Sequence, residues 1–142
     1  MHRIVYLSSA TGELDELQLK QLLLHSRRKN QARAITGLLL VSEGEVLQVL
    51  EGEQSAVEQL YAIIARDIRH THLCKLADGP ITRRSFPDWS MGFATASPEK
   101  FEQLAGYHPL SGNGFLPNKL RSIDGAFFEV LREFATAHTA GV

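Results

Sequence analysis

The sequence predicts one α+β domain, in which a mixed sheet carries two helices on one face and further helices follow at the C-terminus. Two observations support this fold class. Apolar residues recur with a period of two in some segments and of about 3.6 in others, which indicates strands and helices in turn. The chain of 142 residues is long enough to bury one core but short for two domains. The predicted elements have the order βαββαβ, with one added strand.

The first predicted elements are a strand and a helix. Residues 3–8 form the strand. The helix begins near Asp15, because Asp15 and Gln18 have the spacing of a capping box. Its apolar stripe consists of Leu14, Leu17, Leu22 and Leu23.

A hairpin follows this helix. Residues 34–41 are too continuously apolar for a half-exposed strand, so they predict a strand inside the sheet. The Ser-Glu-Gly sequence at residues 42–44 predicts a turn, and a third strand then extends to Glu51.

A second helix and two further strands complete the predicted sheet. Ser55 and Glu58 have capping-box spacing and open a helix that ends near Arg66. The two strands are expected around residues 73–76 and 89–94.

The C-terminal part is predicted to be helical. Ser97-Pro98-Glu99 is typical of a helix start, with proline at the first helical position, and Gly106 is the expected stop. Residues 107–117 are rich in glycine and proline and predict a loop. An amphipathic pattern between Leu120 and Phe134 predicts a last helix, which we expect to pack on the free face of the sheet.

The order βαββαβ is that of the ferredoxin-like, or split βαβ, arrangement. It places the first and third strands side by side at the centre of the sheet. Because side chains alternate along a strand, two sets of residues are then expected to face the helices together. They are Ile4, Tyr6 and Ser8 in the first strand and Val46, Gln48 and Leu50 in the third.

Three polar side chains interrupt these apolar segments. Gln48 is the only amide within the apolar residues 46–50, Tyr6 lies within the first strand, and Asn30 closes the first helix. A buried amide without partners costs about 1–3 kcal/mol. The pattern therefore predicts a polar ligand held inside an otherwise apolar fold.

Composition argues against several function classes. The formal net charge of −1 gives no broad attraction to nucleic acid. No apolar run approaches the roughly 20 residues that span a bilayer, and the N-terminus lacks a secretory signal, so we expect a cytoplasmic protein without a membrane partner. The single cysteine, Cys74, allows no internal disulfide. His70 and His72 without a nearby carboxylate pair make a poor metal site, so no metal is predicted.

Six motifs follow one another along the first two thirds of the chain. They are Ile4-Val5-Tyr6-Leu7-Ser8, Ser26-Arg27-Arg28-Lys29-Asn30, Ile35-Thr36-Gly37-Leu38-Leu39, Leu47-Gln48-Val49-Leu50-Glu51-Gly52, Asp67-Ile68-Arg69-His70 and Phe86-Pro87-Asp88-Trp89-Ser90-Met91-Gly92-Phe93. Together they resemble the BLUF family, the flavin-binding blue-light sensors, over about residues 1–93. They occur in the family's order and spacing, which makes the combination specific. On this basis we expect a flavin-binding core over residues 1–95 and a helical extension of the same compact domain over residues 96–142.

The resemblance implies a blue-light photoreceptor that binds FAD, with FMN or riboflavin as possible substitutes. It implies that Tyr6 donates an electron and a proton in the photochemistry and that Gln48 is the amide that rearranges its hydrogen bonds. Asn30 is then the residue that holds the polar edge of the flavin ring. The resulting signalling state is red-shifted and reversible. A glutamine suits this role because its side chain has a donating and an accepting group of nearly equal size.

The resemblance also suggests further site residues. Asp67 and Arg69 become candidates for contacts to the pyrimidine side of the flavin, and Arg28 for its ribityl or phosphate groups. Trp89 and Met91 would pass the signal to the outer face of the sheet, although such side chains are more often core fillers. The remaining candidates for cofactor contacts are Ser26 and His70.

Arg69 and His70 would otherwise be ordinary cations near a helix end.

Two alternatives share the predicted topology. A small hydrolase of the acylphosphatase kind would need a glycine-bracketed anion loop with a matching arginine, which the sequence lacks. An RNA-binding module should carry stacking aromatics on the central strands and a basic face. Tyr6 is the only aromatic there, and the net charge of −1 is not basic. We therefore expect no enzymatic activity, and a flavin sensor that acts through a downstream protein partner or self-association. A ligand-binding module without photoactivity is the remaining alternative.

Overall fold

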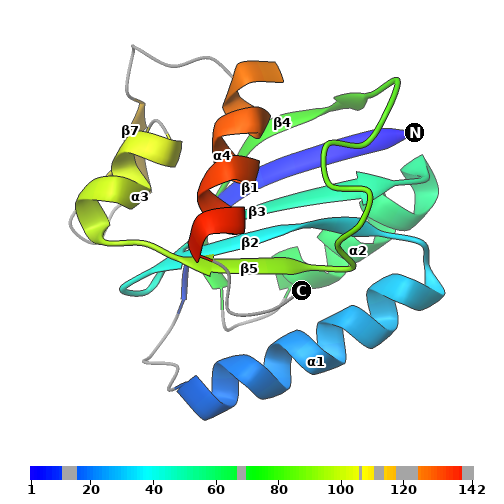
Figure 1. Ribbon diagram of the computed structural model, residues 1–142, viewed down its shortest axis with the longest axis horizontal. Helices are drawn as coiled ribbons and strands as arrows, with labels where there is room; N and C mark the ends of the chain where they lie inside the picture. The colour runs from blue at the N-terminus through cyan, green and yellow to red at the C-terminus, as the bar shows by residue number, and fades with distance from the viewer. Residues whose placement is uncertain (11–15, 67–69, 106, 111–113, 118–124, 139–142) are drawn as a thin grey trace.

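The computed structural model describes residues 1–10, 16–66, 70–105, 107–110, 114–117 and 125–138 (Figure 1). Within these residues, a five-stranded sheet has the order β4-β1-β3-β2-β5. Its strands are β1 (His2–Ala10), β2 (Thr36–Ser42), β3 (Glu45–Gly52), β4 (His70–Pro80) and β5 (Gly92–Thr95). The helices are α1 (Glu16–Ala32), α2 (Gln54–Arg66), α3 (Pro98–Ala105) and α4 (Gly125–His138).

The sheet has the predicted ferredoxin-like topology. β1 lies between β3 and β4 and is antiparallel to both, while β5 adds to β2 in parallel at the edge. Tyr6 is directly opposite Gln48, and Ile4 is opposite Leu50. The central position of the first and third strands and the shared face of these side chains are therefore confirmed.

The β2–β3 turn is also confirmed. Glu43 and Gly44 have positive φ angles of 41° and 88°, which is the backbone of a tight hairpin turn of the type I′ kind. Glycine adopts such a conformation without the steric cost that a Cβ brings, so the Gly44 position explains why the turn falls where the sequence predicts it.

Each face of the sheet has its own core. On one face, Ile4, Tyr6 and Leu50 pack with Leu23 of α1 and Val57 of α2. The opposite face packs against α3 and α4 (Figure 1). Its buried residues include Val5, Leu7 and Val49 from the sheet, Phe101 from α3, and Phe127 and Leu131 from α4. The predicted packing of the last helix on the free face is confirmed.

Residues 107–117 correct the sequence prediction. Instead of a loop they contain two short strands, β6 (Tyr107–Leu110) and β7 (Gly114–Pro117), paired antiparallel. Prolines are excluded from strands only where their missing N–H is needed by a neighbour. In a two-stranded ribbon each strand has one free edge, so Pro109 and Pro117 are compatible with pairing.

Three element boundaries also differ from the prediction. The second helix begins at Gln54, and the Val57 amide donates to the Glu53 carbonyl, so Ser55 and Glu58 are not its capping box. β4 begins at His70 and extends to Pro80, so it is longer at both ends than the strand expected at residues 73–76. The strand expected at residues 89–94 is limited to β5, because residues 90 and 91 form a bend, although the Trp89 carbonyl still accepts from the Gly37 amide of β2 at 3.0 Å.

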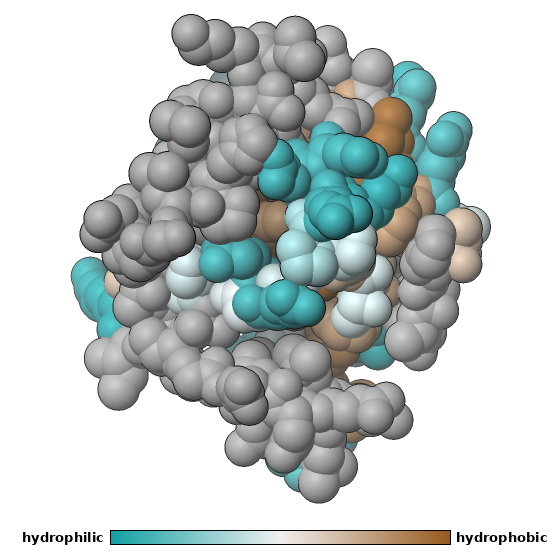
Figure 2. All heavy atoms as spheres, turned by 90° about the vertical axis from the view of Figure 1, so that its left-hand side faces the viewer, coloured by the Kyte–Doolittle hydropathy of each residue, from teal (hydrophilic) through white to brown (hydrophobic). Residues whose placement is uncertain are grey.

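None of the described helices is both long and apolar enough to cross a membrane. Seen from the left-hand side of Figure 1, the described surface is mostly hydrophilic, with a few apolar side chains between the polar ones (Figure 2). Residues 11–15, which include the predicted cap Asp15, and residues 118–124 lie outside the described part of the chain.

Candidate functional site

The site centres on a hydrogen bond between β1 and β3. The Tyr6 hydroxyl donates to Gln48 Oε1, and the Tyr6 side chain is fully buried, with 0% exposure. The two residues face each other in register, so the backbone ladder of the sheet holds the phenol and the amide together. The arrangement provides a proton donor and an acceptor within one rigid element.

Burial also controls the acidity of Tyr6. Desolvation raises the pKa of the Tyr6 phenol far above its ordinary value, and the nearby Tyr61 raises this pKa further. The ring of Tyr61, on α2, lies at 69° to the Tyr6 ring with centroids 5.5 Å apart. Tyr6 is therefore a neutral phenol at physiological pH.

Gln48 has a strong partner on one side and a weak one on the other. Its Oε1 accepts from Tyr6, and its Nε2 donates to the Met91 sulfur at 3.5 Å. A thioether is a weak acceptor, and among the described residues Gln48 has no other side-chain partner. The amide donors are thus free to take a better acceptor, and a flip of the amide would exchange its two faces.

Asn30 lies next to the same segment of chain. It is only 2% exposed, and its Nδ2 donates to the Ser90 carbonyl at 2.9 Å. One turn earlier on α1, Arg27 Nε donates to the Met91 carbonyl at 3.0 Å. The C-terminal half of α1 is therefore tied to the residues that follow Trp89.

Trp89 and Met91 point to opposite faces of the sheet. Met91 belongs to the cluster of Tyr6 and Ile4 under α1 and α2. Trp89 belongs to the core under α4, where its ring stacks on Phe86 with centroids 5.7 Å apart. On a regular strand the two side chains would share a face, so the bend before Gly92 is what separates them.

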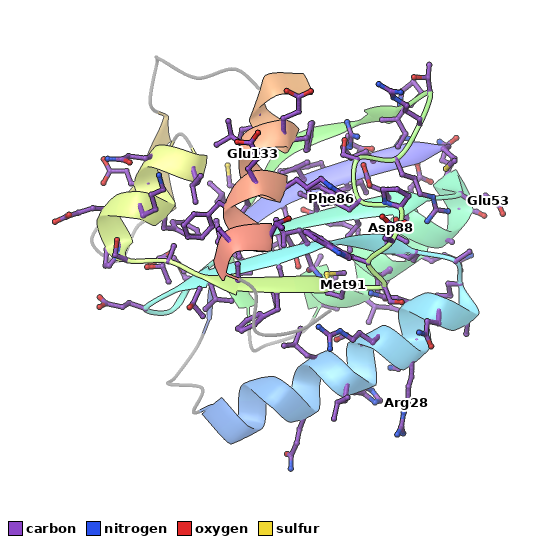
Figure 3. The ribbon with its side chains drawn as sticks, viewed as in Figure 1. Arg28, Glu53, Phe86, Asp88, Met91 and Glu133 are labelled. Atoms are coloured by element: carbon purple, nitrogen blue, oxygen red, sulfur yellow. The ribbon has the colours of Figure 1, made fainter. Side chains whose placement is uncertain are left out.

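The structure does not bring the remaining predicted site residues that it describes to the Tyr6–Gln48 pair. Ser26 is half-buried on α1, and Arg28 is exposed, with its side chain pointing away from the sheet (Figure 3). Asp67 and Arg69 lie outside the described residues, and of His70 only the backbone is described. The structure therefore brings together Tyr6, Gln48 and Met91, with Asn30 attached through Ser90, and it leaves Arg28 apart.

Glu51 is a residue near the site whose role the sequence analysis missed. Its carboxylate is fully buried and accepts from the backbone amides of Ser85 at 3.0 Å and Phe86 at 2.9 Å. Arg3 pairs with it at 2.7 Å and also donates to the Ser85 hydroxyl. A charged residue at the end of an apolar strand was the available signal, because such a charge is buried only when it has partners.

One group of described residues has metal-ligand types close together. Ligand atoms of His2, Glu58 and Asp78 lie within 4.8 Å of one another. However, Asp78 already pairs with His2 at 2.5 Å and with Lys75 at 2.8 Å. Lys75 and His2, in that order, lower the pKa of Asp78, and Asp78 raises the pKa of Lys75. An ammonium on the carboxylate makes this an ion-pair cluster.

The comparisons with known proteins decide the family. The model of the BLUF family, described as sensors of blue-light using FAD, matches residues 1–92. The chain belongs to the BLUF family.

BLUF relatives cover different shares of the chain. The photoactivated adenylate cyclase subunit beta of Euglena gracilis is 35% identical over 108 residues, which are 75% of this chain but only 12% of that protein. The ground state of BlsA has a TM-score of 0.73 and 28% identity, covering 99% of this chain and 91% of BlsA. The dark state of BlrB has a TM-score of 0.63 and 33% identity, covering 73% of this chain and 77% of BlrB. The chain thus resembles both a small part of a large enzyme and nearly the whole of a small BLUF protein.

Proposed function

We propose that this chain is a flavin-based blue-light photoreceptor in which Tyr6 is the electron and proton donor and Gln48 is the switching amide. The observation that carries the proposal is the buried Tyr6–Gln48 hydrogen bond on neighbouring central strands. Membership of a family of blue-light sensors supplies the reaction class.

The residues present fit a flavin. Gln48 Nε2 has only a thioether as acceptor among the described residues, so a ring nitrogen or carbonyl would be a better one. The buried Asn30 amide supplies a second polar group beside an apolar face of the sheet. When bound, the flavin would absorb blue light and become a strong oxidant. We propose FAD, which the family description names, although the structurally similar BlrP1 of Klebsiella pneumoniae has been solved with FMN.

The chain's own residues would move one electron and one proton. Tyr6 would give up an electron to the light-excited flavin, and its Oη proton would pass to Gln48 Oε1 along the existing hydrogen bond. When both return, the phenol is restored and the amide is left rotated or tautomerised. In that state the Gln48 group facing Met91 has changed from donor to acceptor, so the contact with the sulfur changes as well.

The output of this change is proposed to be a protein interaction. The proposal gives the chain no catalytic turnover of its own, and it acts on a partner or on a second copy of itself. Relatives named as adenylate cyclases and as a light-regulated antirepressor show that BLUF proteins take part in different outputs.

The experiment is spectroscopic. The purified protein should be yellow, and blue light should shift its flavin absorption slightly and reversibly to the red. Light scattering after size exclusion, in darkness and under illumination, then tests whether the subunit number changes. A preparation that stays colourless after incubation with FAD, FMN and riboflavin would refute the proposal.

A further inference from the structure

We propose that Arg132 of α4 couples the Gln48 amide to the C-terminal helices by holding the segment formed by residues 85–91. This inference rests on the proposed photoreceptor function and names the residue through which that site reaches α4.

The side chain of Arg132 contacts this segment at three points. Its Nη1 donates to the Ser85 carbonyl at 2.9 Å, and its Nη2 pairs with Asp88 Oδ2 at 3.3 Å. The guanidinium carbon also lies 5.0 Å from the centre of the Trp89 ring. A planar guanidinium can donate along two directions and stack at once, which a lysine cannot do. A movement of Trp89 relative to Ser85 would therefore change the contacts of the Arg132 side chain.

The other end of the same segment touches the photochemical pair. The Met91 sulfur is the acceptor of Gln48 Nε2, and only one residue, Ser90, separates Met91 from Trp89. Trp89 is closely seated: a Cβ added at Gly92 would lie 2.5 Å from its Cε3 atom. In a densely packed core such a ring has few intermediate positions. Displacing Met91 is thus expected to move the Trp89 backbone and its ring together.

The start of the segment is held in place, so a movement that begins at Met91 is expected to displace the residues next to Met91 and not Ser85 or Phe86. The buried Glu51 carboxylate holds the amides of Ser85 and Phe86. Arg3, which pairs with Glu51, lies 3.9 Å from the centre of the Phe128 ring on α4. In Figure 3, Phe86, Asp88 and Met91 lie along the segment that passes between α4 and α1. Between the Glu51 anchor and the site, the carbonyls of Trp89, Ser90 and Met91 accept hydrogen bonds from β2 and α1, so a shift of residues 88–91 has to change these bonds.

Coupling between two sites is reciprocal. If rearrangement of Gln48 changes the contacts of Arg132, then loss of Arg132 must change the free-energy difference between the dark and lit states and, with it, the response of α4 to light. We also expect the rate of return to the dark state to change. A residue that only stabilises the fold would leave the light-dependent change in α4 as it is in the wild type.

The first test compares Arg132→Gln with Glu133→Gln, an exposed neighbour on the same helix. Hydrogen exchange of residues 125–138 is measured in darkness and under continuous blue light, together with dark recovery. Wild type and Glu133→Gln should show a light-dependent change in exchange. Arg132→Gln should keep the red shift, lose at least half of that change and recover at a rate altered more than twofold. Arg132→Lys, which keeps the charge without the fork, should be intermediate.

Two outcomes of this test overturn the inference. One is a wild-type protein that shows the red shift without any change of exchange in α4. The other is an Arg132→Gln variant with the full wild-type change and recovery rate.

A second test needs no light. Thermal unfolding of the flavin-loaded protein in darkness is measured for Met91→Leu, Arg132→Gln and the double variant, with Met91→Leu/Glu133→Gln as the matched control. The Tm losses should be non-additive in the first pair and additive in the second, as expected for residues coupled through a shared segment. Additive losses in both pairs overturn the coupling. Non-additive losses in a protein that lacks any red shift would leave the coupling standing and refute the photoreceptor proposal instead.

Discussion

Tyr6 and Gln48 occupy directly opposed positions on β1 and β3, and the phenol donates its hydrogen bond to the amide oxygen. A slip of one residue in this register would turn one of the two side chains to the opposite face. The sheet ladder therefore fixes the donor–acceptor pair, and the predictions below concern what happens when one member is changed.

Tyr6→Phe is expected to bind flavin and to lose the red shift, because only the hydroxyl that supplies the proton is removed. It leaves the Gln48 oxygen without its donor, so the free energy of unfolding should fall by about 1 kcal/mol. Absorption spectra before and after blue light, with denaturant unfolding in darkness, measure both effects. The matched control is Tyr61→Phe, which should keep the shift, since the Tyr6 contact is with the edge or face of its ring. A normal photoproduct in Tyr6→Phe would contradict the assigned role.

Gln48→Leu is expected to stay yellow but show no red shift under blue light. Leucine has a similar size but has neither an acceptor for the Tyr6 proton nor a donor for a flavin. The flavin difference spectrum measures the result. Gln54→Leu, an exposed amide on α2, is the control and should keep the wild-type spectrum. If Gln48→Leu still gives the wild-type difference spectrum, the amide has no part in the switch.

Part of this site follows from the sequence because it depends only on strand order and the alternation of side chains. These two features place Tyr6 and Gln48 on the same face of neighbouring strands when the register is not shifted by one residue, and the structure supplies that register. The positions of Trp89 and Met91 could not be obtained in this way, because a bend before β5 replaces the regular alternation. Tyr61 and Glu51 were missed as neighbours of the site because their contacts join residues far apart in the sequence.

The C-terminal part shows a different limit. Residues 107–117 contain turn-forming residues, and local propensity favours a loop there. Pairing of β6 with β7 depends on the register of the two strands with each other. Propensity within either strand does not encode that register, so the sequence prediction failed at this point while the helix start at Ser97 was predicted correctly.

Alkaline pH should destabilise the protein through Tyr6. Burial raises the pKa of Tyr6 above the ordinary value of 10.0 that applies in the unfolded chain. Below pH 10 Tyr6 is protonated in both the folded and the unfolded chain, so it makes no pH-dependent contribution to the free energy of unfolding. Above it the unfolded chain loses a proton that the folded state keeps, so wild-type stability should fall by up to about 1.4 kcal/mol per pH unit more than that of Tyr6→Phe. Denaturant unfolding of both proteins from pH 8 to pH 11 measures this difference. If the free energies of unfolding of the two proteins change with pH in parallel, the pKa of Tyr6 is not raised by burial.

Glu51→Gln tests the anchor of the 85–91 segment. The Glu51 carboxylate has 0% exposure and receives donors from Arg3, Ser85 and Phe86. An amide at this position would turn donors toward donors and leave the Arg3 charge uncompensated. Removing one partner of a buried ion pair costs about 3 kcal/mol or more.

The control for this variant is Glu53→Gln, since Glu53 is exposed two residues further on (Figure 3). Its free energy of unfolding should stay within about 0.5 kcal/mol of wild type. Denaturant unfolding in darkness compares the three proteins. Because Glu51 holds Ser85 and Phe86, its loss should also increase hydrogen exchange at these two amides before global unfolding. Equal stability of the two variants would mean that Glu51 does not anchor the segment.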